Sequence, residues 1–207
     1  MAKYETLDLS DICNVGVDEF PAKPALGLQE YRGIPFMIGG ESQNISNLFL
    51  KLDSNSGTVR IKVNKKAYQV IFAHKLLDSK FMKDGSIGCS AAEYKFIMKD
   101  GSKTSVSIRE RFEIASISPD AIPGVPGAPF SAVSDADDSL MDRFEGRWDQ
   151  VGRRQMESSQ ATVQDYYLWN WRNESSDKEI DYIDLIPGEL PVLIAALTLS
   201  NVDENPF

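Results

Sequence analysis

The sequence predicts an all-β protein: an antiparallel β-sandwich of jelly-roll type, with residues 1–207 in a single domain. Three observations favour this fold class. Short apolar segments recur along the chain, several of them alternate apolar with polar residues, and turn-forming residues separate them. The most apolar segments are 166–171, which holds two of the three tryptophans, and 180–199, which is rich in Ile and Leu. Aromatic and β-branched runs of this kind are typical of buried strands.

Three strands are expected in the first 52 residues. The first lies near Leu7, and the others cover 31–38 and 45–52. Pro35 indicates that 31–38 is an edge strand, because proline has no N–H to donate to a neighbouring strand.

Two further strands precede residue 75. In 59–63, apolar residues alternate with Arg60 and Lys62, which predicts one face toward solvent. Residues 64–66 are expected to turn the chain into a strand at 68–74. One face of that strand carries Tyr68, Val70, Phe72 and His74, and the other carries Gln69, Ile71 and Ala73.

A hairpin is expected from 94–98 and 103–114, joined by Asp100-Gly101, a pair that favours a type I′ turn. If the second strand continues in register to 114, Glu110 lies in an otherwise apolar row. A buried carboxylate needs a partner or a shifted pKa. Two interpretations stay open: a structural role, through an ion pair or a bulge that turns Glu110 outward, or a role as an acid or base. The apolar row comprises Val106, Ile108, Phe112 and Ile114.

A long irregular loop is predicted near 117–160, where prolines and glycines interrupt any regular pattern. Loops of this length in a compact domain commonly bind ligands or move. Asp135, Asp137 and Asp138 offer oxygen ligands for calcium, but the run lacks the glycine and the terminal glutamate of an EF-hand, which favours a solvated acidic loop without a metal.

Composition excludes several classes of protein. The net charge of −9 and the lack of a Lys or Arg block argue against binding to nucleic acid or to an anionic membrane. The longest apolar run, 192–197, is too short to span a bilayer. Two cysteines in a chain without a visible secretory signal favour free thiols in the cytoplasm. One histidine and no paired cysteines predict no zinc site, and no cofactor is expected.

Candidate ligand-binding residues come from the central loop and from three positions in predicted strands outside it. Trp148 offers an aromatic surface on which a sugar ring can stack, while arginines nearby can bond sugar hydroxyls. His74 is the only histidine, and a neutral imidazole can act as a base or simply complete a core hydrogen bond. The full candidate set is Trp148, Arg111, Arg153, Arg154, Glu110 and His74.

One set of stretches spans most of the chain: 7–10 with Asn14, 31–36, 67–74, 100–102, 109–114, 169–174 and 178–180. Together these stretches resemble a bacterial jelly-roll module with a galactose-binding-like fold, of the kind found beside glycan-active enzymes and metallohydrolases. The resemblance implies a binding or accessory role, because such modules share no universal catalytic set.

The sequence therefore favours a non-catalytic binding or accessory module, with carbohydrate as the expected ligand class. One alternative is a glycan-active enzyme, a glycosidase or lyase, that uses Glu110 as its acid or base. A second alternative is a structural module that packs against a partner domain or against a second copy of the chain.

Overall fold

A computed structural model describes residues 2–19, 24–40, 46–116, 131–132 and 166–207. Most of these residues form strands, arranged in several antiparallel sheets that do not close into a barrel. The predicted all-β, sandwich-like class is confirmed. No helix in the described ranges is long and apolar enough to cross a membrane.

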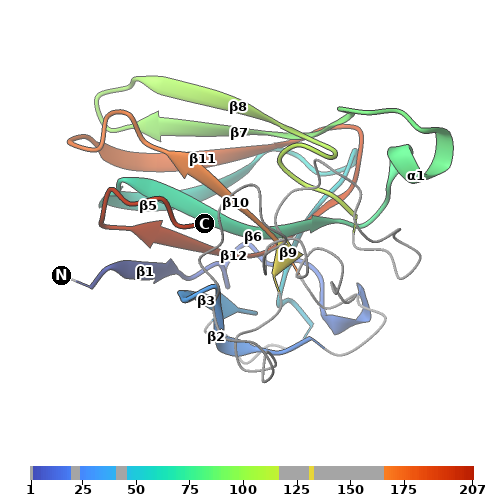
Figure 1. The fold of residues 1–207 in the computed structure, drawn as a ribbon, viewed down its shortest axis with the longest axis horizontal. Helices are drawn as coiled ribbons and strands as arrows, with labels where there is room; N and C mark the ends of the chain where they lie inside the picture. Colours follow the sequence, from blue (N-terminus) through green and yellow to red (C-terminus); the bar gives the residue numbers. More distant parts are fainter. Residues whose placement is uncertain (1, 20–23, 41–45, 117–130, 133–165) are drawn as a thin grey trace, which may run out of the picture.

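Three sheets make up the described chain, and neighbouring strands run antiparallel throughout (Figure 1). The six-stranded sheet has the order β1 (Tyr4–Leu7), β12 (Val192–Ser200), β6 (Gln69–Leu76), β10 (Tyr166–Arg172) and β9 (Ser131–Ala132), with β4 (Leu50–Leu52) also paired to β12. The four-stranded sheet has the order β5 (Val59–Lys66), β11 (Glu179–Pro187), β7 (Ser90–Met98) and β8 (Lys103–Arg109). A hairpin of β2 (Gly27–Tyr31) and β3 (Ile34–Ile38) forms the third sheet, and the helical pieces are η1 (Val17–Glu19) and α1 (Lys80–Asp84).

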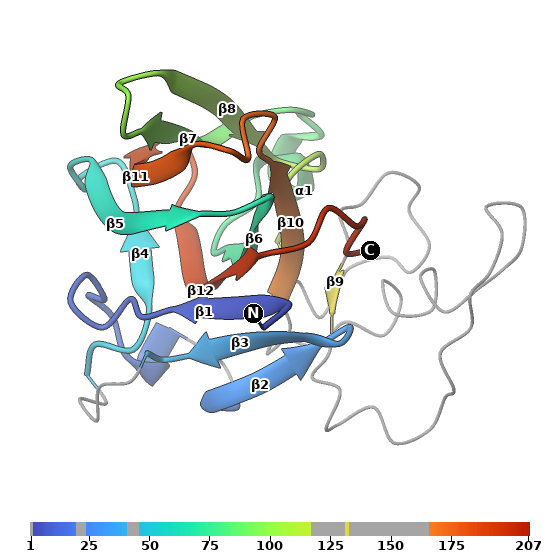
Figure 2. The same ribbon diagram turned by 90° about the vertical axis from the view of Figure 1, so that its left-hand side faces the viewer.

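The six-stranded sheet lies in the middle of the molecule and is covered on both faces. Figure 2 shows the four-stranded sheet on one side of it and the β2-β3 hairpin on the other. Every residue of β6 and β12 is buried, which only a strand covered on both faces can be. Two apolar cores result, one between the two large sheets and one beneath the hairpin.

A bulge in β12 divides its side chains between these cores. Val192 and Ile194 face the four-stranded sheet, but the register against β6 shifts between Ile194 and Ala196. Ala195 and Ala196 therefore both face the hairpin. Their small side chains leave room for β3, where the Pro35 carbonyl accepts a 2.6 Å hydrogen bond from Thr198 Oγ1.

The strand predictions in the first half of the chain are confirmed with changed boundaries. The expected strand at 31–38 is the second half of a hairpin whose two-residue turn, Arg32-Gly33, has positive φ at both positions (56° and 73°). Pro35 is on an edge, because β3 pairs only with β2 among the described strands. The expected turn at 64–66 is wrong: β5 continues to Lys66, and Asn64, with φ of 52°, sits where its register against β11 shifts.

The hairpin of β7 and β8 is confirmed, but its turn type and its length were predicted wrongly. Gly101 has the positive φ (85°), and Met98 O accepts from Gly101 N while Met98 N donates to Ser102 O, which is a type I turn followed by a glycine bulge. β8 ends at Arg109 rather than 114. Residues 110–113 form a turn in which Arg111 has φ of 70°, a conformation that a strand does not allow.

Candidate functional site

His74 lies against Phe72 and Tyr94 in the core between the two large sheets, which we call the main core. It is fully buried, with Nε2 3.1 Å from the Glu113 carbonyl oxygen and Nδ1 3.0 Å from the Tyr94 hydroxyl. A carbonyl can only accept, so Nε2 carries the proton and Nδ1 accepts from Tyr94. Burial lowers the pKa of His74 to about 3, so the imidazole is neutral at pH 7. The geometry assigns His74 a hydrogen-bonding role inside the core.

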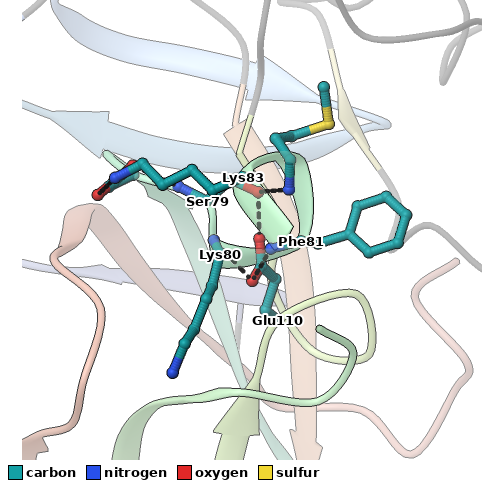
Figure 3. Close-up of polar contacts among 7 residues, drawn as sticks. Ser79, Lys80, Phe81, Lys83 and Glu110 are labelled. Carbon is teal, nitrogen blue, oxygen red and sulfur yellow. Dashed lines mark hydrogen bonds and ion pairs between the residues drawn. The ribbon is translucent and has the colours of Figure 1, made fainter. Parts of the chain in front are cut away.

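Glu110 is also buried, at 1% exposure, and its carboxylate caps α1 (Figure 3). Oε1 accepts from Ser79 Oγ at 2.5 Å, and Oε2 accepts from the backbone N–H groups of Lys80 and Phe81 at 3.1 Å each. The first N–H groups of a helix have no partner within it, so a carboxylate there is stabilised by hydrogen bonds and by the helix dipole. The donors to Glu110 in the described chain are neutral, and the side chain points inward rather than out through a bulge.

Ser79 completes this arrangement as the N-cap of α1. Its Oγ donates to Glu110 and accepts from Met82 N at 3.0 Å. The helix is therefore tied to the turn at 110–113, which lies far from it in sequence. Nothing in the local pattern around Ser79 identifies this partner.

Three of the six predicted site residues converge on that turn. The Arg111 guanidinium carbon lies 4.1 Å from the centre of the Phe81 ring, whose backbone N–H donates to Glu110. The carbonyl oxygen of Glu113, in the same turn, lies 3.1 Å from His74 Nε2. Trp148, Arg153 and Arg154 lie outside the described residues, as do Asp135, Asp137 and Asp138.

A small hollow of about 320 Å³ adjoins α1. Most of its charged groups pair with one another: Lys80 Nζ is 3.1 Å from Glu189 Oε2, and Lys83 Nζ is 2.5 Å from Asp78 Oδ2, which leaves Asp84 as a third carboxylate. The hollow offers little aromatic or apolar surface. The lining residues are Asp78, Lys80, Lys83, Asp84, Glu189 and Leu190.

A larger hollow, of about 780 Å³, opens where β1 begins and where β5 turns into β6. We call it the Tyr68 hollow. Among its lining segments, β1 and the connection between β5 and β6 lie at the end of the molecule where the chain starts, away from α1 (Figure 1). Its lining combines two tyrosine rings with charged and neutral hydrogen-bonding groups: Ala2, Tyr4, Glu5, Lys65, Lys66, Ala67, Tyr68, Ser176 and Asn201.

Backbone hydrogen bonds fix the frame of the Tyr68 hollow. Tyr68 N donates to Ser200 O at 2.9 Å, and Tyr68 O accepts from Asn173 N at 2.8 Å. Asn201 N donates to Lys3 O, and its side-chain amide donates to Ala2 O at 3.1 Å. The Tyr68 ring itself is 39% exposed. Its backbone is thus held rigidly while its ring stays accessible to a ligand.

The sequence pattern did not predict this site, because the alternation in 68–74 placed Tyr68 on the same face as Val70 and Phe72. Those two are fully buried, as expected, but β6 begins only at Gln69. Tyr68 belongs to the short connection after β5, where the sheets end and the core no longer covers the ring.

The described residues contain no cluster of three or more His, Cys, Asp or Glu side chains placed to hold a metal ion. Cys13 and Cys89 are free thiols, and burial raises the pKa of Cys13 to about 11, with a smaller contribution from Asp8. Cys13 is therefore a protonated, unreactive thiol at pH 7.

The structure supports the resemblance to galactose-binding-like modules at the level of a sandwich-like, all-β fold compatible with a jelly roll. The finer family assignment and its bacterial context stay predictions. Comparison with known proteins adds no relative: no family model matches the chain, and neither does any curated protein or solved structure.

Proposed function

We propose that this chain is a non-catalytic carbohydrate-binding module, built on a jelly-roll sandwich of galactose-binding-like type, whose ligand occupies the Tyr68 hollow. The observation that carries the proposal is the composition of this hollow, which places exposed tyrosine beside convergent polar groups. Its volume of about 780 Å³ is in the range of small-molecule sites.

A sugar needs both kinds of surface. One face of a pyranose ring presents C–H groups that pack on an aromatic ring, while its edge presents hydroxyls that donate and accept hydrogen bonds. Tyr68 supplies the aromatic face, Ser176 and Asn201 supply neutral hydrogen-bonding groups, and Lys66 supplies a donor. Because the backbone here is already fixed, binding orders little of the protein, which favours affinity.

The alternative of a glycan-active enzyme has less support from the described residues. Its expected acid or base, Glu110, is buried and accepts three hydrogen bonds that hold α1 in place. It also contacts α1, whereas β1 and the connection between β5 and β6, which line the Tyr68 hollow, lie at the other end of the molecule from α1 (Figure 1). An acid or base must reach the substrate, and this carboxylate has no exposed path to the hollow.

Tyr68→Ala tests the proposal. A glycan array first identifies a ligand, and calorimetry then compares the two proteins. We expect the variant to bind the ligand about fivefold more weakly or worse, since truncating an aromatic anchor commonly costs 1 kcal/mol or more. The melting temperature should change little, because the ring is partly exposed.

Phe112→Ala is the matched control, because Phe112 is an exposed aromatic residue at the α1 end. It should leave the affinity unchanged. Equal affinity of wild-type protein and Tyr68→Ala for the array ligand would remove the Tyr68 hollow as the binding site.

A second candidate function, packing against another copy of the chain, is favoured by one observation. Met82, Ile87 and Phe112 are exposed apolar residues at the α1 end. The loop 85–88 adjoins Phe112, because a Cβ placed on Gly88 would lie 3.4 Å from the Phe112 ring. Exposed apolar patches often mark interaction surfaces.

Sedimentation velocity over a wide concentration range tests this second function. If the patch mediates self-association, we expect a concentration-dependent dimer that Ile87→Ser weakens, while Leu28→Ser, at an exposed apolar position in β2, leaves it intact. A protein that is monomeric at every concentration rules out self-association through this patch.

The remaining expectations about partners and location stay predictions. These are a cytoplasmic location, based on two free thiols, and the lack of nucleic-acid and membrane partners, based on the net charge of −9.

A further inference from the structure

The outer face of the four-stranded sheet carries a group of cations. In its strands, alternate residues such as Ile61, Phe96 and Ile183 enter the main core, so their neighbours point away from it. Cations project outward from three of the four strands. They are Arg60 and Lys62 of β5, Lys95 of β7 and Lys103 of β8.

Strand register arranges these side chains in two rows across the sheet. Asp184 of β11 pairs with Arg60 on one side and with Lys95 on the other, and Lys95 pairs with Ser105. In the next row Tyr182 pairs with Lys62 and with Ile97, and Ile97 pairs with Lys103. Since paired strands lie about 4.8 Å apart, the second row is an apolar centre with a lysine at each end.

The charges in the first row are only partly balanced. The Arg60 guanidinium forms a bidentate pair with Asp184, at 2.6 and 2.8 Å, and its central carbon lies 4.8 Å from the Tyr182 ring. The Arg60 hydrogen bond is the main cause that lowers the pKa of Asp184, and Lys95 and Lys103 lower it further. One carboxylate thus lies in the field of three cations.

Glu93 is a second carboxylate on this face, 3.5 Å from Lys95, and Asp181 at the bulge of β11 adds a third negative charge near Arg60, whose pKa it helps to raise. Lys62 forms no ion pair with any described residue. The face therefore has an excess of positive charge on a protein whose net charge is −9. The positive face attracts an anion, while the negative charge of the rest of the molecule repels a densely charged one. This combination favours a ligand that is anionic but not densely charged.

We propose that this outer face binds a linear acidic polysaccharide, a polymer of uronate type whose carboxylates meet Lys62 and Lys103. Tyr182 and Ile97 between the lysines give a sugar ring an apolar surface, and the exposed Ser105 and Ser107 hydroxyls face the same side of the sheet. Nucleic acid fits less well, because among the described residues this face offers a single aromatic side chain, Tyr182, for base stacking. The inference goes beyond the proposed function, since it concerns other side chains and does not depend on the Tyr68 hollow.

Binding to polygalacturonate tests the inference, with its fully methyl-esterified form as the matched neutral polymer. We expect the intact chain to bind the acid, more weakly as salt rises, and not to bind the ester. The double variant Lys62→Gln/Lys103→Gln should bind about fivefold more weakly, because exposed ion pairs contribute modestly and two are lost.

The control double variant is Lys3→Gln/Lys83→Gln, which changes the net charge equally at exposed lysines away from this face. It should bind polygalacturonate within about twofold of the wild-type protein. Equal loss in both double variants, or equal binding of acid and ester, would overturn the inference. Tighter binding of single-stranded DNA through Lys62 and Lys103 would assign the face to nucleic acid instead.

Tyr68→Ala separates this inference from the proposed function. Polygalacturonate affinity should be unchanged in that variant, and its loss would move the acidic ligand to the Tyr68 hollow and overturn the assignment to the outer face. Conversely, failure of the array ligand to respond to Tyr68→Ala leaves the result for Lys62 and Lys103 intact.

Discussion

Replacing Trp171 with alanine is expected to lower the free energy of unfolding by about 3–5 kcal/mol, the range for truncating a large buried aromatic side chain. Trp171 is 6% exposed, and its ring stacks on Phe96 with centroids 3.6 Å apart and planes inclined by 6°. Trp171 belongs to β10 and Phe96 to β7, so this stack joins the two large sheets. Its loss opens a cavity at their interface.

Urea unfolding followed by circular dichroism measures this effect, with Trp169→Ala as the matched control. Trp169 projects from the same strand. Its ring centroid lies 5.5 Å from that of Phe72 and 5.8 Å from that of Tyr94, but the side chain is only partly buried. We expect its truncation to cost less than that of Trp171. An equal or larger cost for Trp169→Ala would show that the Trp171 stack does not dominate the interface.

Lowering the pH from 6.5 to 4.5 is expected to reduce the free energy of unfolding by roughly 2.5 kcal/mol through His74 alone. The pKa of His74 is about 3 in the folded protein, below the ordinary value of 6.5 that applies in the unfolded chain. Between these values the unfolded chain binds a proton that the folded protein excludes. Stability from the neutral imidazole is thus complete above pH 6.5 and is lost as the pH falls toward 3.

Urea unfolding at a series of pH values compares the wild-type protein with His74→Gln. Glutamine keeps a donor and an acceptor for Glu113 and Tyr94 but does not titrate. The variant should lose the His74 part of the slope, and the difference between the two proteins is cleanest from pH 6.5 to about 5.5, above the range in which Asp and Glu titrate. Identical slopes for both proteins would mean that the pKa of His74 does not differ between the folded and unfolded states.

Most of the fold could be predicted from the sequence, because strands and their turns produce recognisable local sequence patterns. Alternation in 59–63 and the turn at Asp100-Gly101 each mark an element that the structure contains. What the pattern does not encode is which strands share a sheet. Every position of β12 is apolar or small except Thr198 and Ser200, and only the tertiary structure shows that a separate hairpin covers its second face.

The candidate sites were less predictable, because they depend on contacts between distant residues. Glu110 was recognised as a buried carboxylate, but the donors that satisfy it belong to a helix some thirty positions earlier. The Tyr68 hollow joins segments from both ends of the sequence, including Tyr4 and Asn201. The cationic face requires the register of four strands, of which only the β7-β8 pairing is apparent from a local hairpin.

The central place of β12 has a consequence for synthesis. This strand pairs with β1, β4 and β6, and it follows all three in the chain, so it is synthesised after them. The middle layer therefore cannot close until β12 has been made, and the earlier strands keep apolar faces unpaired up to that point. We expect the nascent chain to be most prone to aggregation in the interval before Val192–Ser200 is available.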